Sequence, residues 1–389
     1  MKPAAAVSRP DWEIFCKVVD NYGDIGVCWR LARALAAGAG FSVRLWVDDW
    51  AAFARLCPDL AGADGEVCRG GIEVRRWTDP LPEVEPAAVV IEAFACDLPD
   101  VHLRAMAAQP LAPVWINLEY LSAEGWVAGC HRLASPHPAL PLVKHFFFPG
   151  FDADTGGLIR ETGLLAERDA FRAGDGRAAW FAAQGMALPS PDTLVVSLFA
   201  YEQPALAELV AAWAQGERPV LLLVPEGRVL GDLAAAVGMD GLAPGARLQR
   251  GQLALAVLPF TDQAGYDRLL WACDLNFVRG EDSFVRAQWA AHPFVWQIYL
   301  QDGDAHVDKL DAFVARWCAG LEAPAAAALR RFWSAWNGAG GIAAAWPDFA
   351  AVLPALAAHA RDWCGRLAAQ DDLVMRLTQF CNHIRAVKR

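Results

Sequence analysis

The chain has 389 residues, of which 55% are hydrophobic and 20% are charged. This composition is typical of a globular protein, and the length exceeds that of one ordinary core, so we expect two domains. The formal net charge is −11, which argues against an extended phosphate-binding surface because nucleic-acid affinity depends on clustered lysine and arginine. We therefore expect no nucleic acid among its partners.

Ten cysteines are scattered along the chain without a CxxC pair, a spacing that predicts neither a zinc site nor a disulfide framework. Residues 1–10 lack the apolar core of a signal peptide, and we expect no later segment to be apolar for long enough to span a bilayer. These observations predict a soluble, reduced, cytoplasmic protein without a membrane partner.

The first predicted elements are an apolar strand, the glycine loop Asp20–Gly26 and a helix. Gly23 and Gly26 let this loop turn sharply and approach a ligand closely. Asp20 and Asp24 place two carboxylates at the carboxyl end of the strand, where open α/β sheets bind ligands. A turn with a purely structural role needs the glycines but not both acids, so Asp20 and Asp24 are candidate catalytic residues.

Alternating apolar runs and helical patterns fill the first half of the chain, which is typical of βαβ units around a parallel sheet. The predicted strands span residues 14–19, 42–47, 71–76, 88–94 and 114–118, and the predicted helices span 29–37 and 50–57. Residues 138–157 are rich in proline, glycine and aromatic side chains, which predicts a long surface segment. We place the domain boundary at residues 188–192, so that the first domain spans residues 1–188.

The same alternation resumes in the second half, which predicts a second doubly wound domain over residues 189–370. Its predicted strands span residues 193–198, 219–224, 253–257 and 274–278, and its predicted helices span 203–213, 231–236 and 262–272. The C-terminal third is rich in alanine, a strong helix former, with breaks expected at residues 338–341 and at Pro347. Final helices are predicted over residues 355–369 and 371–387.

A glycine turn and a helix start follow the last predicted strand, in the sequence Arg279-Gly280-Glu281-Asp282-Ser283. Asp282 and Ser283 alone are ordinary helix caps. Glu281 is harder to explain as a cap, because a carboxylate beside a helix N-terminus can bind ribose hydroxyls while the free N–H groups bind phosphate.

Other turns of the second predicted domain carry aromatic and polar side chains. Phe260 offers a face on which a planar base can stack, and Gln263 offers an amide donor and acceptor. Phe199 and Tyr201 follow the first strand of this domain. Each turn alone is more often structural than functional, but together with Glu281 they favour a single nucleotide pocket.

Missing motifs narrow the chemistry further. Neither the GxGxxG fingerprint nor a GxxxxGK[ST] phosphate loop occurs, which disfavours a dinucleotide dehydrogenase and an NTPase. The acids at 152 and 154, and those at 302 and 304, follow no clear predicted strand and are expected to be loop residues rather than a metal site. The histidines match no metal-binding spacing, so we expect neither a metal nor a cofactor.

Four sequence blocks resemble the EarP family of protein-arginine rhamnosyltransferases, which modify elongation factor P. They are Ile14–Arg33, Asn117–Ser122, Phe146–Phe151 and Arg279–Trp289, and the resemblance extends over nearly the whole chain. It implies a GT-B glycosyltransferase, an α/β fold with two Rossmann-like domains facing each other across a cleft. It also implies a dTDP-β-L-rhamnose donor in the C-terminal domain, elongation factor P against the N-terminal domain, and a last helix, residues 371–389, that packs back on the N-terminal domain.

The resemblance also assigns site residues. The family's essential acids correspond to Asp20, Asp24 and Glu281. We expect contacts with the donor nucleotide at Tyr22, Gly23, Phe199, Tyr201, Phe260, Gln263, Gly280, Glu281, Asp282 and Ser283. Glu119 and Tyr120 follow a predicted strand and are candidates for the acceptor side.

An arginine acceptor is chemically demanding because its guanidinium is always protonated and has no lone pair to offer. Two carboxylates can clamp this cation and remove a proton as the nitrogen attacks. We therefore assign Asp24 as the general base and Asp20 as the group that orients the acceptor, in an inverting displacement. Two alternatives stay open: a GT-B enzyme for a small-molecule or glycan acceptor, and a non-catalytic nucleotide-sugar-binding protein. The identity of the sugar rests on the resemblance alone.

Overall fold

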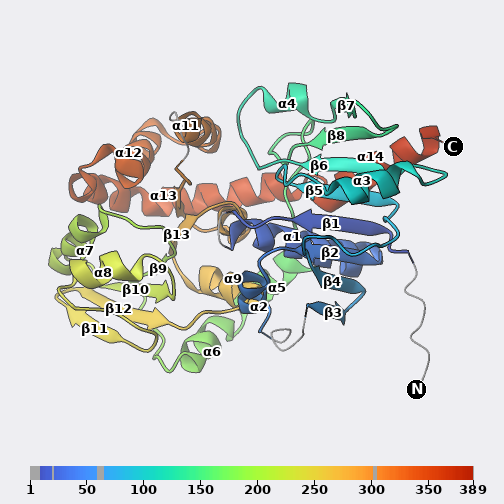
Figure 1. Ribbon diagram of the computed structural model, residues 1–389. Coiled ribbons are helices and arrows are strands. Elements are labelled where there is room, and N and C mark those ends of the chain that lie inside the picture. Colours follow the sequence, from blue (N-terminus) through green and yellow to red (C-terminus); the bar gives the residue numbers. More distant parts are fainter. Residues whose placement is uncertain (1–8, 20–21, 59–64, 301–304, 389) are drawn as a thin grey trace, which may run out of the picture. The chain divides into compact units, whose positions relative to one another are not determined.

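A computed structural model describes residues 9–19, 22–58, 65–300 and 305–388, shown in Figure 1. The chain forms two compact units. The first contains Met1–Thr162 and Ala368–Arg389, and the second contains Gly163–Leu367. Each unit has its own sheet and its own buried core.

The first unit contains an eight-stranded sheet with the order β3-β4-β2-β1-β5-β6-β8-β7. Parallel pairing joins its six inner strands: β1 (Trp12–Cys16), β2 (Val43–Val47), β4 (Ile72–Arg76), β5 (Val89–Ala93), β6 (Val114–Leu118) and β8 (Val143–Phe147). The short edge strands β3 (Glu66–Arg69) and β7 (Ala134–Pro136) pair antiparallel. The helices of this unit are α1 (Gly23–Arg33) with the π-helical turn η1 (Ala34–Gly38), α2 (Trp50–Leu56), α3 (Asp100–Ala107), α4 (Val127–Cys130) and α14 (Leu373–Lys388).

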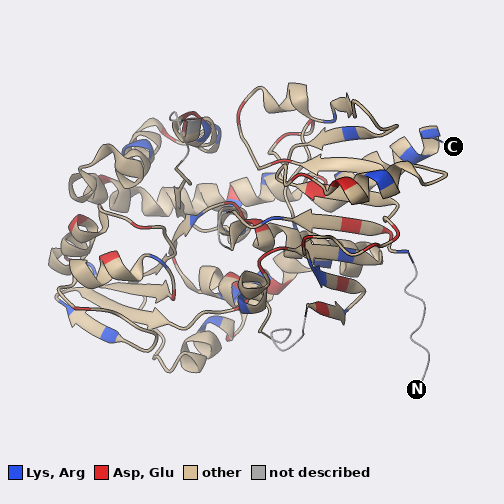
Figure 2. Cartoon of the chain, viewed as in Figure 1, with Lys and Arg blue, Asp and Glu red and all other residues tan. Residues whose placement is uncertain are grey.

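Charged side chains are buried within this sheet, and Figure 2 shows acidic and basic positions within its strands. Arg44 bonds to Glu73 through Nε at 2.7 Å and to Glu13 through Nη1 at 3.2 Å. The indole of Trp46 donates to Glu13 at 2.6 Å, and His102 lies 3.1 Å from the same carboxylate. Burial opposes ionisation of Glu13, but the hydrogen bonds and charges of His102, Trp46 and Arg44 outweigh it, so the pKa of Glu13 is lowered. The sheet therefore tolerates these charges because they are paired.

The last helix, α14, packs on the first unit. Arg376 donates from Nη1 to the carbonyl of Thr155 at 2.8 Å, and the Phe380 ring contacts His145 at a centroid distance of 5.3 Å. Near its end, Lys388 donates to the carbonyl of Pro113 at 3.1 Å. Hydrogen bonds and an aromatic contact thus bind this helix to segments far away in the sequence.

The second unit contains a six-stranded sheet with the order β11-β12-β10-β9-β13-β14. Its parallel strands are β9 (Leu194–Leu198), β10 (Val220–Pro225), β12 (Leu253–Leu258), β13 (Leu275–Arg279) and β14 (Phe294–Gln297), and β11 (Arg247–Arg250) pairs antiparallel at the edge. The helices that precede or connect these strands are α5 (Leu164–Ala173), α6 (Gly176–Ala183), α7 (Leu206–Gln215), α8 (Leu230–Ala236), α9 (Gln263–Ala272) and α10 (Asp282–Trp289). After the sheet come α11 (Ala305–Trp317), α12 (Ala323–Ser334), the turn η4 (Ala335–Ala339) and α13 (Ile342–Ala368).

Both strand orders contain a topological switch point, where successive crossovers leave in opposite directions. In the first sheet the switch point lies between β1 and β5, and in the second it lies between β9 and β13. Ligands of open α/β sheets bind at the carboxyl ends of the strands that flank such a point. The fold therefore identifies one candidate position in each unit.

The unit boundary differs from the predicted one at residues 188–192, because it lies at Thr162–Gly163. Helices α5 and α6 consequently belong to the second unit. The Phe181 side chain of α6 is fully buried in one cluster with Val195 and Leu223 of the second sheet. Amphipathic periodicity alone does not indicate which sheet a helix covers, and the prediction had included residues 163–188 in the first domain.

Two local predictions were also wrong. Part of the expected surface segment 138–157 is the strand β8, which pairs with β6 and buries Phe147. Pro347 does not break the C-terminal helix, since α13 continues through Pro347 and Pro354. Both prolines are exposed, so neither ring is placed in the packed face of the helix.

The segment from α13 to α14 is apolar enough, by length and composition alone, to pass as a membrane span, contrary to the expectation that no segment would be. The apolar residues of α13 recur with helical spacing, and Ile342, Phe349 and Leu356 are fully buried. This pattern is typical of a core helix of a globular unit.

Candidate functional site

The first switch point positions Asp24, which lies in the first turn of α1 directly after the β1 loop. The side chain is 2% exposed. The backbone N–H of Val19 donates to Oδ2 at 2.8 Å, and the hydroxyl of Tyr120 donates to Oδ1 at 3.1 Å. Each carboxylate oxygen therefore accepts a hydrogen bond that fixes its orientation.

Polar residues lie at the end of β6, and one of them, Tyr120, contacts this acid. The Asn117 side chain accepts from the backbone N–H of Ala95 at 3.1 Å and donates to the Glu119 carboxylate at 2.5 Å. The structure thus brings Tyr120 into contact with Asp24, and it holds the neighbouring Glu119 through Asn117. Both residues follow β6, where they were predicted as candidates for the acceptor side.

The structure places the three other predicted site residues of this loop differently. Asp20, the proposed orienting acid, lies outside the described residues. Tyr22 directly precedes α1, with Arg55 above its ring at 5.9 Å, and Gly23 is the first residue of that helix. Both belong to the first unit, whereas the other predicted nucleotide contacts all belong to the second.

The second switch point contains a buried arginine between two aromatic rings. The guanidinium carbon of Arg279, at the end of β13, lies 4.6 Å from the ring centroid of Phe199 and 4.4 Å from that of Tyr201. Arg279 is 5% exposed, and its Nε and Nη1 have no hydrogen-bond partner. Because a buried guanidinium requires acceptors for its N–H groups, this arrangement is suited to an anionic ligand.

Arg279 is the functional candidate that the sequence patterns do not identify. Its only sequence signal is its place at the end of a predicted strand, immediately before the glycine turn. The stacking on Phe199 and Tyr201 depends on the pairing of β13 with β9, which no local pattern contains.

The turn after Arg279 leads into the N-terminus of α10. Gly280 has φ of +58°, a backbone conformation that favours glycine. The Ser283 hydroxyl accepts from the backbone N–H of Arg279 at 3.0 Å and also bonds to its carbonyl, so Ser283 closes the turn. Glu281 occupies the N-cap position without capping α10 through its side chain, and Asp282 lies in the first turn. The N-cap position is thus occupied by Glu281 and not by Asp282 or Ser283, which were expected to be ordinary helix caps.

Charged contacts fix the C-terminal half of helix α10. Arg286 makes a two-pronged ion pair with Asp267 of α9, with distances of 2.8 and 2.6 Å. At the C-terminus, Arg168 of α5 donates to the carbonyl of Trp289 at 2.7 Å. A cation at this end also complements the helix dipole, so charged contacts hold the C-terminal half of α10 in place.

The β12–α9 loop contributes Phe260 and Gln263. Gln263 begins α9 and is buried, and Asp262 caps that helix by accepting from Gly265 N at 2.7 Å. Tyr266, on the same face of α9 as Gln263, contacts Phe199 with ring centroids 5.4 Å apart. This face of α9 is therefore directed towards Arg279, Phe199 and Tyr201, which we call the Arg279 cluster.

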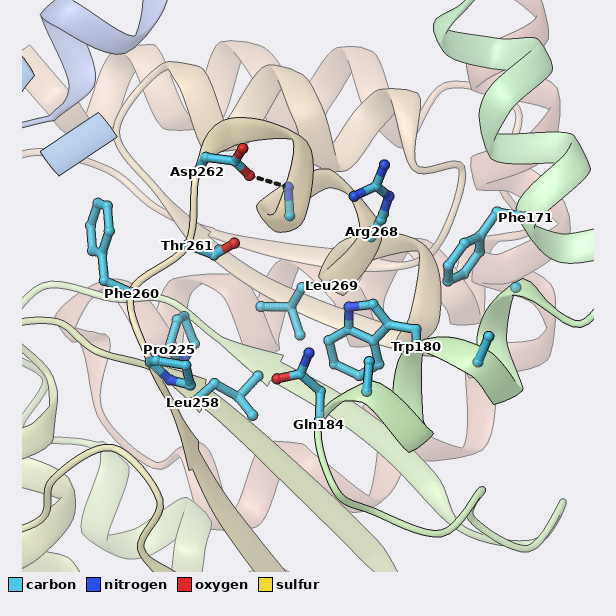
Figure 3. A pocket seen from close by; sticks show the side chains of 15 residues that line it. Phe171, Trp180, Gln184, Pro225, Leu258, Phe260, Thr261, Asp262, Arg268 and Leu269 are labelled. Atoms are coloured by element: carbon cyan, nitrogen blue, oxygen red, sulfur yellow. Dashed lines mark hydrogen bonds between the residues drawn. The ribbon is translucent and has the colours of Figure 1, made fainter. Parts of the chain in front are cut away.

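A pocket of about 510 Å³ lies on a different face of α9, shown in Figure 3. Gly265, Arg268 and Leu269 line it together with Trp180 of α6, and Phe260 lies at its rim. By helical spacing, Gly265 and Arg268 face away from Gln263 and Tyr266, whereas Leu269 follows Tyr266 by three residues and lies nearer to its side of the helix. The pocket and the Arg279 cluster are thus separate features that share the β12–α9 loop.

A family model described as elongation-factor P (EF-P) rhamnosyltransferase EarP matches residues 12–382. A protein-arginine rhamnosyltransferase of Pseudomonas putida is 51% identical over 373 residues, which cover 96% of this chain and 98% of the relative. That of Pseudomonas aeruginosa is 50% identical over 369 residues, 95% of this chain and 98% of the relative.

Solved structures agree with these matches. The chain is similar to a structure of EarP-mediated arginine glycosylation of translation elongation factor EF-P, with a TM-score of 0.70, 38% identity and coverage of 96% of this chain and 99% of the other. The spinosyn rhamnosyltransferase SpnG matches with a TM-score of 0.50, 15% identity and coverage of 95% and 99%, which shows the fold alone. The fold is that of GT-B glycosyltransferases, and the chain belongs to the EarP family of elongation-factor P rhamnosyltransferases.

Proposed function

We propose that this protein transfers rhamnose from dTDP-β-L-rhamnose to an arginine side chain of elongation factor P, with inversion and without a metal ion. The names of the relatives support the sugar and the acceptor. The observation that carries the donor assignment is the buried guanidinium of Arg279, which has unpartnered N–H groups at the second switch point.

The leaving group of this reaction is a nucleoside diphosphate. Negative charge develops on its terminal phosphate as the bond to the anomeric carbon breaks. Arg279 provides a positive charge, and the N-terminus of α10 provides the positive end of a helix dipole. Together they stabilise the departing diphosphate, which is the role that a divalent cation has in metal-dependent transferases. Glu281 binds the ribose, and Phe199, Tyr201 and Gln263 complete the nucleotide site.

The acceptor nitrogen needs a base. Asp24 accepts two hydrogen bonds that orient its carboxylate, and in this proposal it accepts the guanidinium proton while the nitrogen attacks the anomeric carbon. One carbon–nitrogen bond forms, the bond to the diphosphate oxygen breaks, and the proton stays on Asp24. Attack opposite the leaving group inverts the configuration at that carbon.

The test is incubation with dTDP-β-L-rhamnose and elongation factor P, followed by intact-mass spectrometry. We expect a mass increase of one rhamnosyl group, and none on an elongation factor P whose acceptor arginine is replaced by lysine. Modification of the lysine variant would contradict an arginine acceptor. Donor hydrolysis without protein modification would favour a small-molecule or glycan acceptor, and donor binding without any turnover would favour a binding protein.

A further inference from the structure

The turn after β5 holds three non-glycine residues in the left-handed region. Phe94, Ala95 and Asp97 have φ of +56°, +53° and +56°. For residues with a Cβ atom this conformation costs free energy and persists only where the surroundings enforce it, most often near functional sites. The turn also lies at the first switch point, beside β1.

Neighbouring strand ends hold this turn. The N–H of Phe94 donates to the carbonyl of Leu118 at 2.7 Å, and the N–H of Ala95 donates to the Asn117 side chain at 3.1 Å. The next residue, Cys96, donates from Sγ to the carbonyl of Phe15 at 3.4 Å. Contacts with both β6 and β1 therefore enforce the left-handed backbone.

The result of this backbone conformation is an aromatic stack. The Phe94 ring lies on the Tyr120 ring with centroids 4.3 Å apart and an interplanar angle of 15°. The hydroxyl of Tyr120 in turn donates to Asp24 at 3.1 Å. We propose that Phe94 is a positioning residue for Asp24: its strained backbone places a ring that fixes the Tyr120 phenol, and the phenol orients the carboxylate.

This inference rests on the proposed role of Asp24 as the base. A base that is misplaced by a fraction of a hydrogen-bond length loses rate without losing donor affinity. Tyr120→Phe keeps the stack and removes the hydroxyl, so we expect kcat to fall about tenfold with an unchanged KM for the donor. Phe94→Ala removes the stack, and we expect a smaller fall in kcat with the same unchanged KM.

A double-mutant cycle separates positioning from general destabilisation. Because both side chains act through one hydrogen bond, Phe94→Ala is expected to have little effect on kcat in the Tyr120→Phe background. The control is Phe41→Ala, which removes the aromatic contact with Trp12 at the opposite end of the strands. We expect its effect to be independent of Tyr120→Phe, and additive effects of Phe94→Ala would overturn the proposal.

Further variants guard against a folding defect. Phe94→Tyr keeps the stack and should keep kcat within about twofold. Phe94→Gly suits the positive φ but lacks the ring, so we expect it to fold and still to lose kcat. Full kcat in Phe94→Gly overturns the proposal. A crystal structure of this variant needs no transfer reaction: we expect the Tyr120 hydroxyl to leave Asp24, and an undisturbed hydrogen bond overturns the inference even if the proposed function fails.

Discussion

The guanidinium of Arg279 lies 4.4 Å from the Tyr201 ring centroid, although 77 residues separate them in the sequence. The pairing of β9 with β13 creates this contact. Phe199 lies 4.6 Å from the same guanidinium, so two cation–π contacts hold the Arg279 side chain, which is 5% exposed.

Arg279→Ala should weaken dTDP binding about ten- to hundredfold, because a hydrogen bond to a charged group contributes about 1.5–3 kcal/mol. The dTDP affinity of Arg279→Lys should lie between those of the unchanged protein and Arg279→Ala, since an ammonium group retains the charge but not the planar stacking. Isothermal titration calorimetry with dTDP measures both affinities. Arg268→Ala is the matched control, because Arg268 is exposed and lines the separate pocket. Weaker dTDP binding by Arg268→Ala but not by Arg279→Ala would show that the nucleotide binds in that pocket.

Asp24→Asn should lower kcat about a hundred- to ten-thousandfold, the usual contribution of a general base. Donor affinity should stay unchanged, because Asp24 lies in the first unit and the Arg279 cluster lies in the second. Intact-mass kinetics and calorimetry measure the two quantities. Asp11→Asn is a suitable control, since Asp11 is exposed at the start of β1. Loss of donor binding in Asp24→Asn would contradict the assignment of Asp24 as the general base.

Much of the site could be predicted because it lies in local patterns. An apolar run, a glycine turn and an acid fix the position of Asp24 at a strand end, and the same logic places Glu281 before α10. Such patterns involve only a few neighbouring residues, so they can be recognised in a single sequence without knowledge of the tertiary structure.

The remainder depends on tertiary contacts that no local pattern encodes. Arg279 has the same sequence signature as any polar residue at a strand end, and only its neighbours Phe199 and Tyr201 distinguish it. Phe94 adopts positive φ without being glycine, so no glycine in the sequence marks that turn. The strand β8 was missed for another reason: prolines and glycines flank a short run in which burial of Phe147 is not visible.

Transfer should be insensitive to a chelator. If Arg279 and the α10 N-terminus neutralise the departing diphosphate, EDTA should leave kcat within about twofold of its value in added Mg²⁺. Intact-mass kinetics after dialysis against EDTA measure this. A loss of activity that Mg²⁺ restores would show that a cation has the role proposed for Arg279.

Replacing only one partner of the ion pair between Arg286 and Asp267 should lower the free energy of unfolding substantially. Both groups are buried, so Arg286→Met leaves the Asp267 carboxylate buried without this ion pair and should lower the free energy of unfolding by about 3–5 kcal/mol. The double variant Arg286→Met with Asp267→Leu removes both charges and should recover most of that loss. Urea denaturation measures the three proteins. Equal destabilisation of single and double variants would show that the packing of α9 on α10, rather than the charge, accounts for the effect.

His131 should make the protein less stable in acid. Its Nδ1 accepts a hydrogen bond from the backbone N–H of Phe148 at 3.1 Å, which requires a neutral ring. Burial, with the charges of Arg132 and Arg376, lowers the pKa of His131 to about 4. Between that value and about 6.5, the usual pKa, the unfolded chain binds a proton that the folded protein does not, so the free energy of unfolding falls as the pH falls through this window. From pH 7 to pH 5 we expect a loss of roughly 1–2 kcal/mol from this group, allowing for its partial exposure. His131→Gln keeps an acceptor but does not titrate, so urea denaturation at both pH values should show a smaller loss in the variant. An equal loss in both proteins would show that His131 is already protonated in the folded state or that other groups control the acid response.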